Sequence, residues 1–200
     1  KDSYIKNNIA KDVDLIKQLY ASLGFNFAEV DTKVRNEDSL NLDVIFDINK
    51  GDPTRISKIT FVGNKKVKDK RLRDIIASEE HKFWKFITRN TKFNQNLVNM
   101  DKRLLKNYYK STGYYDVQIK SNSAKINKND GDIELIYSID AGDRYIIKKI
   151  VTNADPVIDK NIFYPLNKEY QRFVGSYYSP FKIKKLLDEI DELIEINNLQ

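Results

Sequence analysis

Apolar and polar positions alternate most clearly between residues 55 and 144, where the pattern predicts three strands. The first strand begins at Ile56 in a segment rich in β-branched residues, and two more follow in 115–123 and 133–139. Each strand places apolar side chains on one face and more polar side chains on the other, as in a sheet with one covered face. This segment therefore predicts a sheet that other elements must bury.

Two helices are predicted between the first strand and the other two. Asp69 is the expected N-cap of a short helix, and a longer helix starts after Asn94 and stops at Gly113, a residue suited to a left-handed C′ position. One face of the longer helix carries residues at helical spacing: Leu97, Asp101, Leu104, Leu105 and Tyr108. The order strand, helix, helix, strand, strand predicts an α+β fold with two helices on one face of a three-stranded sheet.

Two segments of this unit recur elsewhere in the chain. The pattern of 20–25, Tyr-Ala-Ser-Leu-Gly-Phe, returns at 109–114, and the pattern of 42–52 returns at 133–143, both at a spacing of about ninety residues. Two unrelated patterns that recur in one order at nearly one spacing indicate copies of one structural unit. Arrays of such units commonly present surfaces to other chains.

The copies predict three units of unequal completeness. Residues 1–54 form a partial unit with the second helix and the last two strands, which are expected in 28–34 and 40–48. Residues 55–144 form a complete unit. Residues 145–200 form a partial unit with the first strand, in 145–151, followed by helices. The expected hinges between units are short and consist of Gly51, Asp52 and Pro53, and of Gly142, Asp143 and Arg144.

The composition removes several kinds of chemistry. The 200 residues include no cysteine and a single histidine, His81, so thiol nucleophiles, disulfides and His-pair metal sites are absent. No Gly-rich phosphate loop or serine elbow occurs, and we therefore predict neither an enzyme nor a cofactor or metal site. The lack of cysteine fits the cytoplasm or a bacterial periplasm. The formal net charge of +6 leaves nucleic-acid binding as a remote alternative.

At this point the chain resembles polypeptide-transport-associated (POTRA) domains. The resemblance rests on the order of the elements, the Tyr-x-Ser-x-Gly corner after the second helix, the Gly-Asp pair that closes the last strand, and the segment 56–64. The run of units is most similar to the periplasmic arm of the BamA family of outer-membrane-protein assembly factors. The resemblance implies tandem β-α-α-β-β units, each with a three-stranded mixed sheet covered on one face by two helices.

The resemblance also implies a function and partners. The arm would bind unfolded outer-membrane β-barrel proteins in the periplasm, hold accessory assembly lipoproteins, and join a C-terminal membrane barrel in the full-length protein. It would bind no nucleic acid and no small molecule. The alternative is a structural or partner-docking POTRA arm of a related transporter or division protein.

With the strands in the order one, three, two, the second strand of each unit lies at an edge of its sheet. An edge strand offers unpaired N–H and C=O groups to which an extended peptide of any sequence can add. The candidate peptide-binding residues are Tyr115, Val117, Ile119, Ser121 and Ser123 in the complete unit, and Ala28, Val30, Thr32 and Val34 in the first unit. Alternatively, these are ordinary edge strands protected from pairing by Lys120 and Lys125.

A second candidate is an aromatic segment between the two helices of the complete unit. Phe83, Trp84 and Phe86 lie among basic residues, a combination enriched at binding hot spots, and we predict a partner-contact loop. The alternative is that one or two of these aromatic residues anchor the loop to the core.

Overall fold

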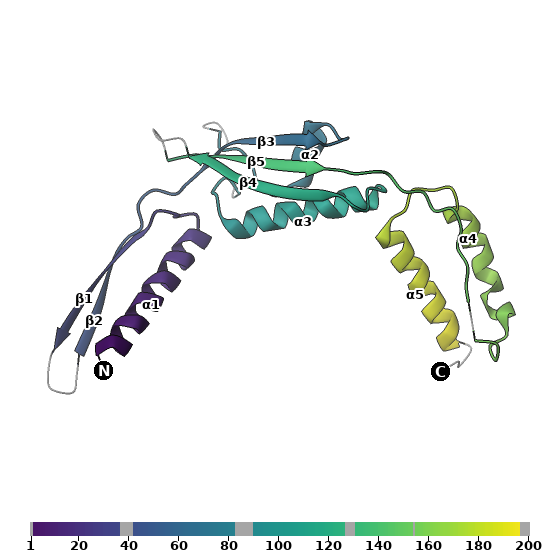
Figure 1. Cartoon of the computed structure of the whole chain (residues 1–200), viewed down its shortest axis with the longest axis horizontal. Helices are drawn as coiled ribbons and strands as arrows, with labels where there is room; N and C mark the ends of the chain where they lie inside the picture. Colours follow the sequence, from purple (N-terminus) through teal and green to yellow (C-terminus); the bar gives the residue numbers. More distant parts are fainter. Residues whose placement is uncertain (1, 37–41, 83–89, 127–130, 154, 197–200) are drawn as a thin grey trace.

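The computed structural model describes residues 2–36, 42–82, 90–126, 131–153 and 155–196. In Figure 1 the chain forms an arch, with a sheet at the top of the middle part and a flank descending on each side. The first flank contains helix α1 (Asp2–Ser22) and the antiparallel pair β1 (Glu29–Asn36) and β2 (Leu42–Asn49). As predicted, this part of the chain holds one helix and two strands; α1 contacts β1, and the turn after the helix ends at a glycine with positive φ, Gly24.

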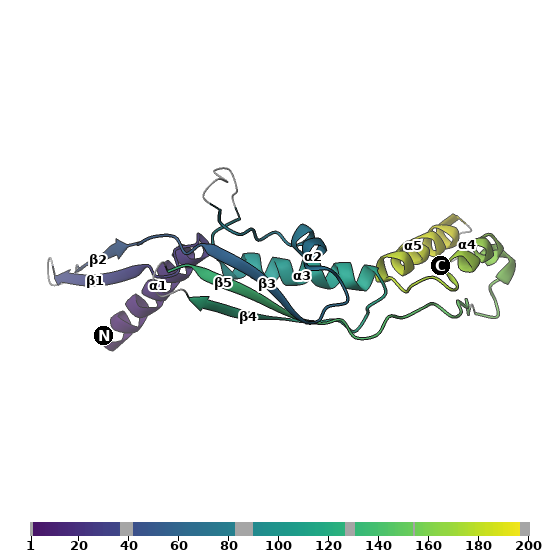
Figure 2. The ribbon, with the colours of Figure 1, turned by 90° about the horizontal axis from the view of Figure 1, so that it is seen from above.

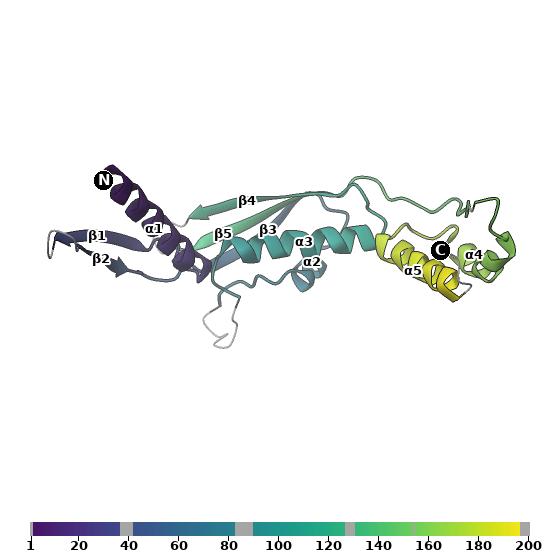
Figure 3. The ribbon, with the colours of Figure 1, turned by 90° about the horizontal axis from the view of Figure 1, so that it is seen from below.

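The middle of the chain has five elements in the predicted order. They are β3 (Ile56–Asn64), α2 (Asp69–Ile75), α3 (Gln95–Ser111), β4 (Gln118–Ile126) and β5 (Ile133–Asp140). The sheet has the order β3-β5-β4, with β3 parallel and β4 antiparallel to β5. Figure 3, seen from below, shows α3 running under the sheet beside α2. The predicted mixed three-stranded sheet with two helices on one face is confirmed.

The core of this middle part lies between the sheet and the two helices. Strand β5 alternates strictly, and its inward side chains Ile133, Leu135, Tyr137 and Ile139 are all buried. Leu135, Tyr137 and Ile139 belong to one cluster with apolar side chains of α2 and α3, including Leu72 and Leu105. The alternation in the sequence is therefore a direct record of which side of the sheet is covered.

The helix ends show how local sequence sets the boundaries. Helix α3 begins after Asn94, whose side chain accepts a hydrogen bond from the backbone N–H of Leu97 at 2.8 Å. The predicted cap of the shorter helix was wrong. Its N-cap is Lys68, and Asp69 lies in the first helical turn, where its carboxylate pairs with the Lys65 ammonium instead of capping a backbone N–H.

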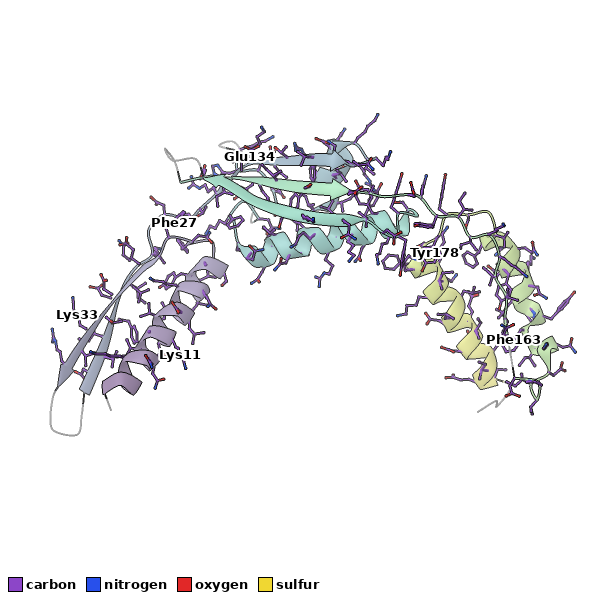
Figure 4. All side chains as sticks on the ribbon, in the orientation of Figure 1. Lys11, Phe27, Lys33, Glu134, Phe163 and Tyr178 are labelled. Atoms are coloured by element: carbon purple, nitrogen blue, oxygen red, sulfur yellow. The ribbon has the colours of Figure 1, made fainter. Side chains whose placement is uncertain are left out.

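The second flank consists of a 3₁₀ helix η1 (Lys160–Leu166), α4 (Asn167–Phe173) and α5 (Pro180–Ile196) around a small core. Figure 4 marks Phe163 of η1, which is buried in that core. The helices predicted for this part of the chain are present. The predicted strand over 145–151 is wrong: its backbone makes one isolated bridge, from Ile146 to Tyr177. A ladder needs a neighbouring strand, and no described segment runs beside 148–151 as one.

Two predicted strand starts were also too early. Strand β1 begins at Glu29 rather than Ala28, and β4 begins at Gln118 rather than Tyr115, so that Tyr115 and Val117 precede the strand. Gln118 pairs with Asp140, the last residue of β5, and β5 has no residue left to pair with 115–117. The alternating pattern continues through Val117 because that side chain is buried in the core. A residue just before a strand can be buried in this way without pairing to a neighbouring strand.

Candidate functional site

The candidate peptide-binding edge is the outer side of β4. Figure 2, seen from above, places β3 and β4 along opposite long sides of the middle sheet, with β5 between them. Within the described part of the chain, the only strand beside β4 is β5. Ile119 points toward the core and is half-buried, whereas Lys120 is exposed. Ser121 and Ser123 lie in β4, and a register irregularity separates Asn122 from Lys125.

The opposite edge, β3, is occupied by side chains and a loop. The guanidinium of Arg73 donates to the carbonyl oxygen of Ile59 at 2.9 Å, and the carboxylate of Glu80 accepts from the N–H of Ile59 at 3.0 Å. The backbone N–H of His81 donates to the carbonyl oxygen of Ile56 at 2.7 Å. These bonds use the groups that an added strand would need. The two edges of this sheet therefore differ: among the described residues, such bonds to the outer backbone are made on β3 and not on β4.

Sequence reasoning did not find Arg73 and Glu80. They bond to the same backbone residue and lie 3.4 Å from each other as an ion pair. Side chains that reach back to a strand 14 and 21 residues earlier leave no periodic signal. The only visible hint was the charged content of the short helix and the segment after it.

The face of the sheet turned away from the helices is polar. Lys58 and Glu134 form an ion pair at 3.3 Å across β3 and β5, and the hydroxyl of Thr60 donates to Glu134 at 2.9 Å. Figure 4 shows Glu134 on this face. This face of the sheet therefore presents charged and polar side chains rather than a continuous apolar surface.

In the first unit the candidate edge is β1. Val30, Thr32 and Val34 lie in this strand, and the buried Ala28 immediately precedes it. Val34 is half exposed, and the ammonium of Lys33 lies 3.7 Å from the carboxylate of Asp47. Figure 4 marks Lys33 on the outer side of this flank. This ribbon of two strands is less enclosed than the middle sheet.

A buried network of hydrogen bonds links the elements that support β4. The carboxylate of Asp101 on α3 is fully buried and accepts hydrogen bonds from the backbone N–H groups of Ala77 at 2.7 Å and Ser78 at 3.1 Å. Its second oxygen accepts from the hydroxyl of Tyr137 on β5. Burial raises the pKa of Tyr137 above its ordinary value, and the neighbouring carboxylate raises it further. The network ties α3, the end of α2 and the central strand together.

Equivalent backbone hydrogen bonds recur at the two predicted hinges. At the first joint (residues 51–56), the N–H of Thr54 donates to Gly24 at 2.8 Å, and the N–H of Phe93 donates to Thr54 at 2.9 Å. At the second joint (residues 142–147), the N–H of Tyr145 donates to Gly113 at 2.9 Å, and the N–H of Tyr178 donates to Tyr145 at 2.9 Å.

Further contacts repeat at the two joints. Ile56 and Ile147 each donate a backbone hydrogen bond to the segment that follows their own unit's first helix, at 2.8 and 3.0 Å. Isolated bridges link Arg55 with Lys92 and Ile146 with Tyr177. Each joint is thus a fixed corner as well as a short connector. The predicted hinge residues Gly51, Asp52, Pro53, Gly142, Asp143 and Arg144 all lie at these corners.

The predicted partner-contact loop falls outside the part of the chain that the structure describes. Phe83, Trp84 and Phe86 all lie in the omitted segment 83–89, so this loop stays a prediction. Over the described ranges, no group of three or more potential metal-ligating side chains occurs. Within the same ranges, no helix is both long and apolar enough to span a bilayer.

Comparison with known proteins identifies the family. The POTRA family model, described as "Surface antigen variable number repeat", matches residues 1–51 and 54–142, which is more than half of the chain. The chain belongs to the POTRA family. The two matched segments meet at the first joint. The division into units at 54/55 and 144/145 stays a prediction.

Individual relatives point to one group within that family. The chain is 23% identical over 140 residues to the outer membrane protein assembly factor BamA of Neisseria meningitidis, covering 70% of this chain and 18% of that protein. It is 22% identical over 205 residues to BamA of Buchnera aphidicola, covering all of this chain and 31% of that protein. The chain therefore spans less than a third of the length of these curated relatives.

A solved structure supports the fold. POTRA domains 3–5 of BamA from Haemophilus influenzae superpose with a TM-score of 0.53 at 18% sequence identity, covering 92% of this chain and 68% of that one. At this identity the similarity concerns the fold.

Proposed function

We propose that this chain is part of the periplasmic arm of an outer-membrane protein assembly machine. In this role it binds unfolded β-barrel proteins by adding their strands to the edge of β4. The observation that carries the proposal is the asymmetry of the middle sheet: among the described residues, Arg73, Glu80 and the loop at His81 bond to outer backbone groups of β3, and β4 is the edge strand without such bonds. The names of the relatives supply the class of client.

Pairing through the backbone suits clients that share alternating strands but no common motif. The main-chain bonds give affinity without reading sequence, and side-chain contacts add selectivity. The buried network around Asp101 and Tyr137 keeps β5 in place, so β4 is presented on a rigid frame. The accessory lipoproteins and the membrane barrel belong to the same proposal as partners of the full-length protein.

The test uses peptides that differ only in their backbone. A fluorescent ten-residue peptide with alternating apolar and polar residues is prepared in three forms: unmodified, N-methylated on odd residues, and N-methylated on even residues. An added strand directs alternate N–H groups toward its neighbour and toward solvent. We expect one methylated form to bind the 200-residue chain like the unmodified peptide and the other to lose about tenfold or more in affinity, equivalent to about 1.4 kcal/mol.

Cross-linking then locates the bound peptide. Because the sequence has no cysteine, Lys120→Cys on β4 and the matched control Lys58→Cys on β3 each introduce a unique thiol. Both native side chains are exposed. We expect a cysteine-containing peptide to form a disulfide with the β4 variant well before the β3 variant. Equal binding of both methylated peptides, or faster cross-linking at β3, would refute strand addition at β4 and favour a docking role.

A further inference from the structure

The two joints share their backbone bonds but differ in the side chains that surround them. At the first joint, four positions around the corner hold Asn26, Thr54, Arg55 and Phe93. The corresponding positions of the second joint hold Tyr115, Tyr145, Ile146 and Tyr178. The first joint forms the same hydrogen bonds and the same kind of isolated bridge. The additional aromatic and apolar side chains of the second joint are therefore not needed to form the corner.

The four residues of the second joint, Tyr115, Tyr145, Ile146 and Tyr178, line a shallow cavity of about 290 Å³. Tyr115 and Tyr145 are each 46% exposed and Ile146 is 57% exposed. Figure 4 shows Tyr178 in the corner between α3 and α5. The counterpart of Ile146 at the first joint, Arg55, is also exposed, even though it lies in the complete middle unit. The exposure of Ile146 is therefore a property of this corner of the fold.

The cavity is held in shape without a ligand. The hydroxyl of Tyr145 donates to the carboxylate of Asp116 at 2.6 Å, and this hydrogen bond raises the pKa of Tyr145. The rings of Tyr115 and Tyr178 meet edge to face, with centroids 5.3 Å apart. The ammonium of Lys110 lies 4.6 Å from the centroid of the Tyr115 ring. A ligand would therefore lose little free energy to ordering these side chains.

The cavity adjoins the start of the candidate edge. Tyr115 lies three residues before Gln118, the first residue of β4, and residues 115 and 116 form a turn, so the separation is less than the about 10 Å that three extended residues would cover. Charges of both signs surround the cavity: the ammonium of Lys110 lies over the Tyr115 ring, the guanidinium of Arg144 lies 3.2 Å from the centroid of the Tyr177 ring, and the carboxylate of Asp116 accepts from Tyr145. The lining itself is aromatic and apolar, and it therefore suits an uncharged ring.

We propose that this cavity binds an aromatic or large apolar side chain of the peptide strand paired with β4, from a residue just beyond the partner of Gln118. The inference rests on the proposed function and adds a position at which the client sequence is read. Main-chain bonds to β4 would hold any extended strand, and this cavity would select strands that carry a ring at one end.

The experiment combines two peptides with two forms of the chain. One peptide carries a single Phe at the end expected over the cavity, and its partner carries Ala there. The chain is used unchanged and as the double variant Tyr115→Asn, Ile146→Arg, which installs the first-joint residues at two of the four positions. We expect the Phe peptide to bind the unchanged chain about tenfold more tightly than the Ala peptide, and the double variant to lose this preference.

The outcomes separate the two proposals. If the Phe and Ala peptides bind equally while N-methylation still discriminates, the cavity inference is overturned and strand addition survives. If neither peptide depends on the N-methyl pattern, strand addition itself fails. The Ala peptide serves as the folding control, because a correctly folded double variant must still bind it. Should the double variant misfold, Ile146→Arg alone, at an exposed position, tests the same preference.

Discussion

Replacing Asp101 by alanine tests whether the buried network holds the frame of the middle sheet. The substitution removes the acceptor of two backbone N–H groups, on Ala77 and Ser78, and of the Tyr137 hydroxyl, and it leaves these donors in a buried place. Hydrogen bonds to a charged group contribute about 1.5–3 kcal/mol each, and losses within one network do not add fully. We therefore expect the free energy of unfolding to fall by about 3–5 kcal/mol.

Helix propensity works in the opposite direction, which sharpens this prediction. Alanine is a better helix former than aspartate by up to about 0.7 kcal/mol, so an exposed position on a helix would gain stability from the same change. Asp74 on α2 is exposed and provides the matched control, Asp74→Ala. Asp101→Asn keeps one acceptor oxygen and should lose less, about 1–2 kcal/mol.

The assay must report on the middle unit, because a chain of several units does not have to unfold in one step. Native-state hydrogen exchange of the buried β5 residues Leu135 and Ile139, read by NMR, gives that local value. We expect protection to fall by about 100-fold or more in Asp101→Ala, the equivalent of about 3 kcal/mol. A fall of less than tenfold, or an equal fall in Asp74→Ala, would show that the network does not stabilise this unit.

Three further changes test other parts of the structure. Gly63→Ala should cost about 2–4 kcal/mol, because φ is +89° and a Cβ would lie 2.5 Å from the carbonyl oxygen of Ile139; Gly131→Ala, with open space around it, should cost about 1 kcal/mol in the same urea titration. Stability should fall as the pH rises above about 10, since unfolded Tyr137 and Tyr109 lose their protons there while the raised folded pKa retains them; Tyr137→Phe should flatten this fall in an alkaline melt, and an unchanged slope would contradict it. Arg144→Ala removes the 2.7 Å hydrogen bond to the Thr112 carbonyl and the stacking on Tyr177. The distribution of distances between spin labels on α3 and α5 should therefore broaden, while amide hydrogen exchange in β5 stays unchanged.

The sequence was sufficient for the middle unit because its local and long-range signals agree. Alternation at Ile133, Leu135, Tyr137 and Ile139 matches a strand buried on one side, and the repeat places a glycine corner after α1 and after α3. Asp101 also left a signal, since it is the carboxylate on an otherwise apolar helix face. What that carboxylate binds became visible only when α3 and β5 were placed together.

The remaining differences come from interactions that have no period. Segment 145–151 has a strand-like composition, but a strand is defined by its partner, and the neighbouring backbone groups at 175–178 form a corner instead. Covering of β3 by Arg73 and Glu80 depends on side chains that fold back over many residues. The cavity at the second joint draws residues from three separate segments.

The repeated corner has a consequence for how such arms evolve. The same amide-to-carbonyl contacts appear wherever one unit meets the next, and in Figure 1 both flanks turn toward the same side. Recombination that gains or loses one unit would preserve the geometry of each remaining corner and would change mainly the reach and total curvature of the arm. Length thus becomes a property that selection can adjust in whole steps, independently of what any single unit has come to recognise.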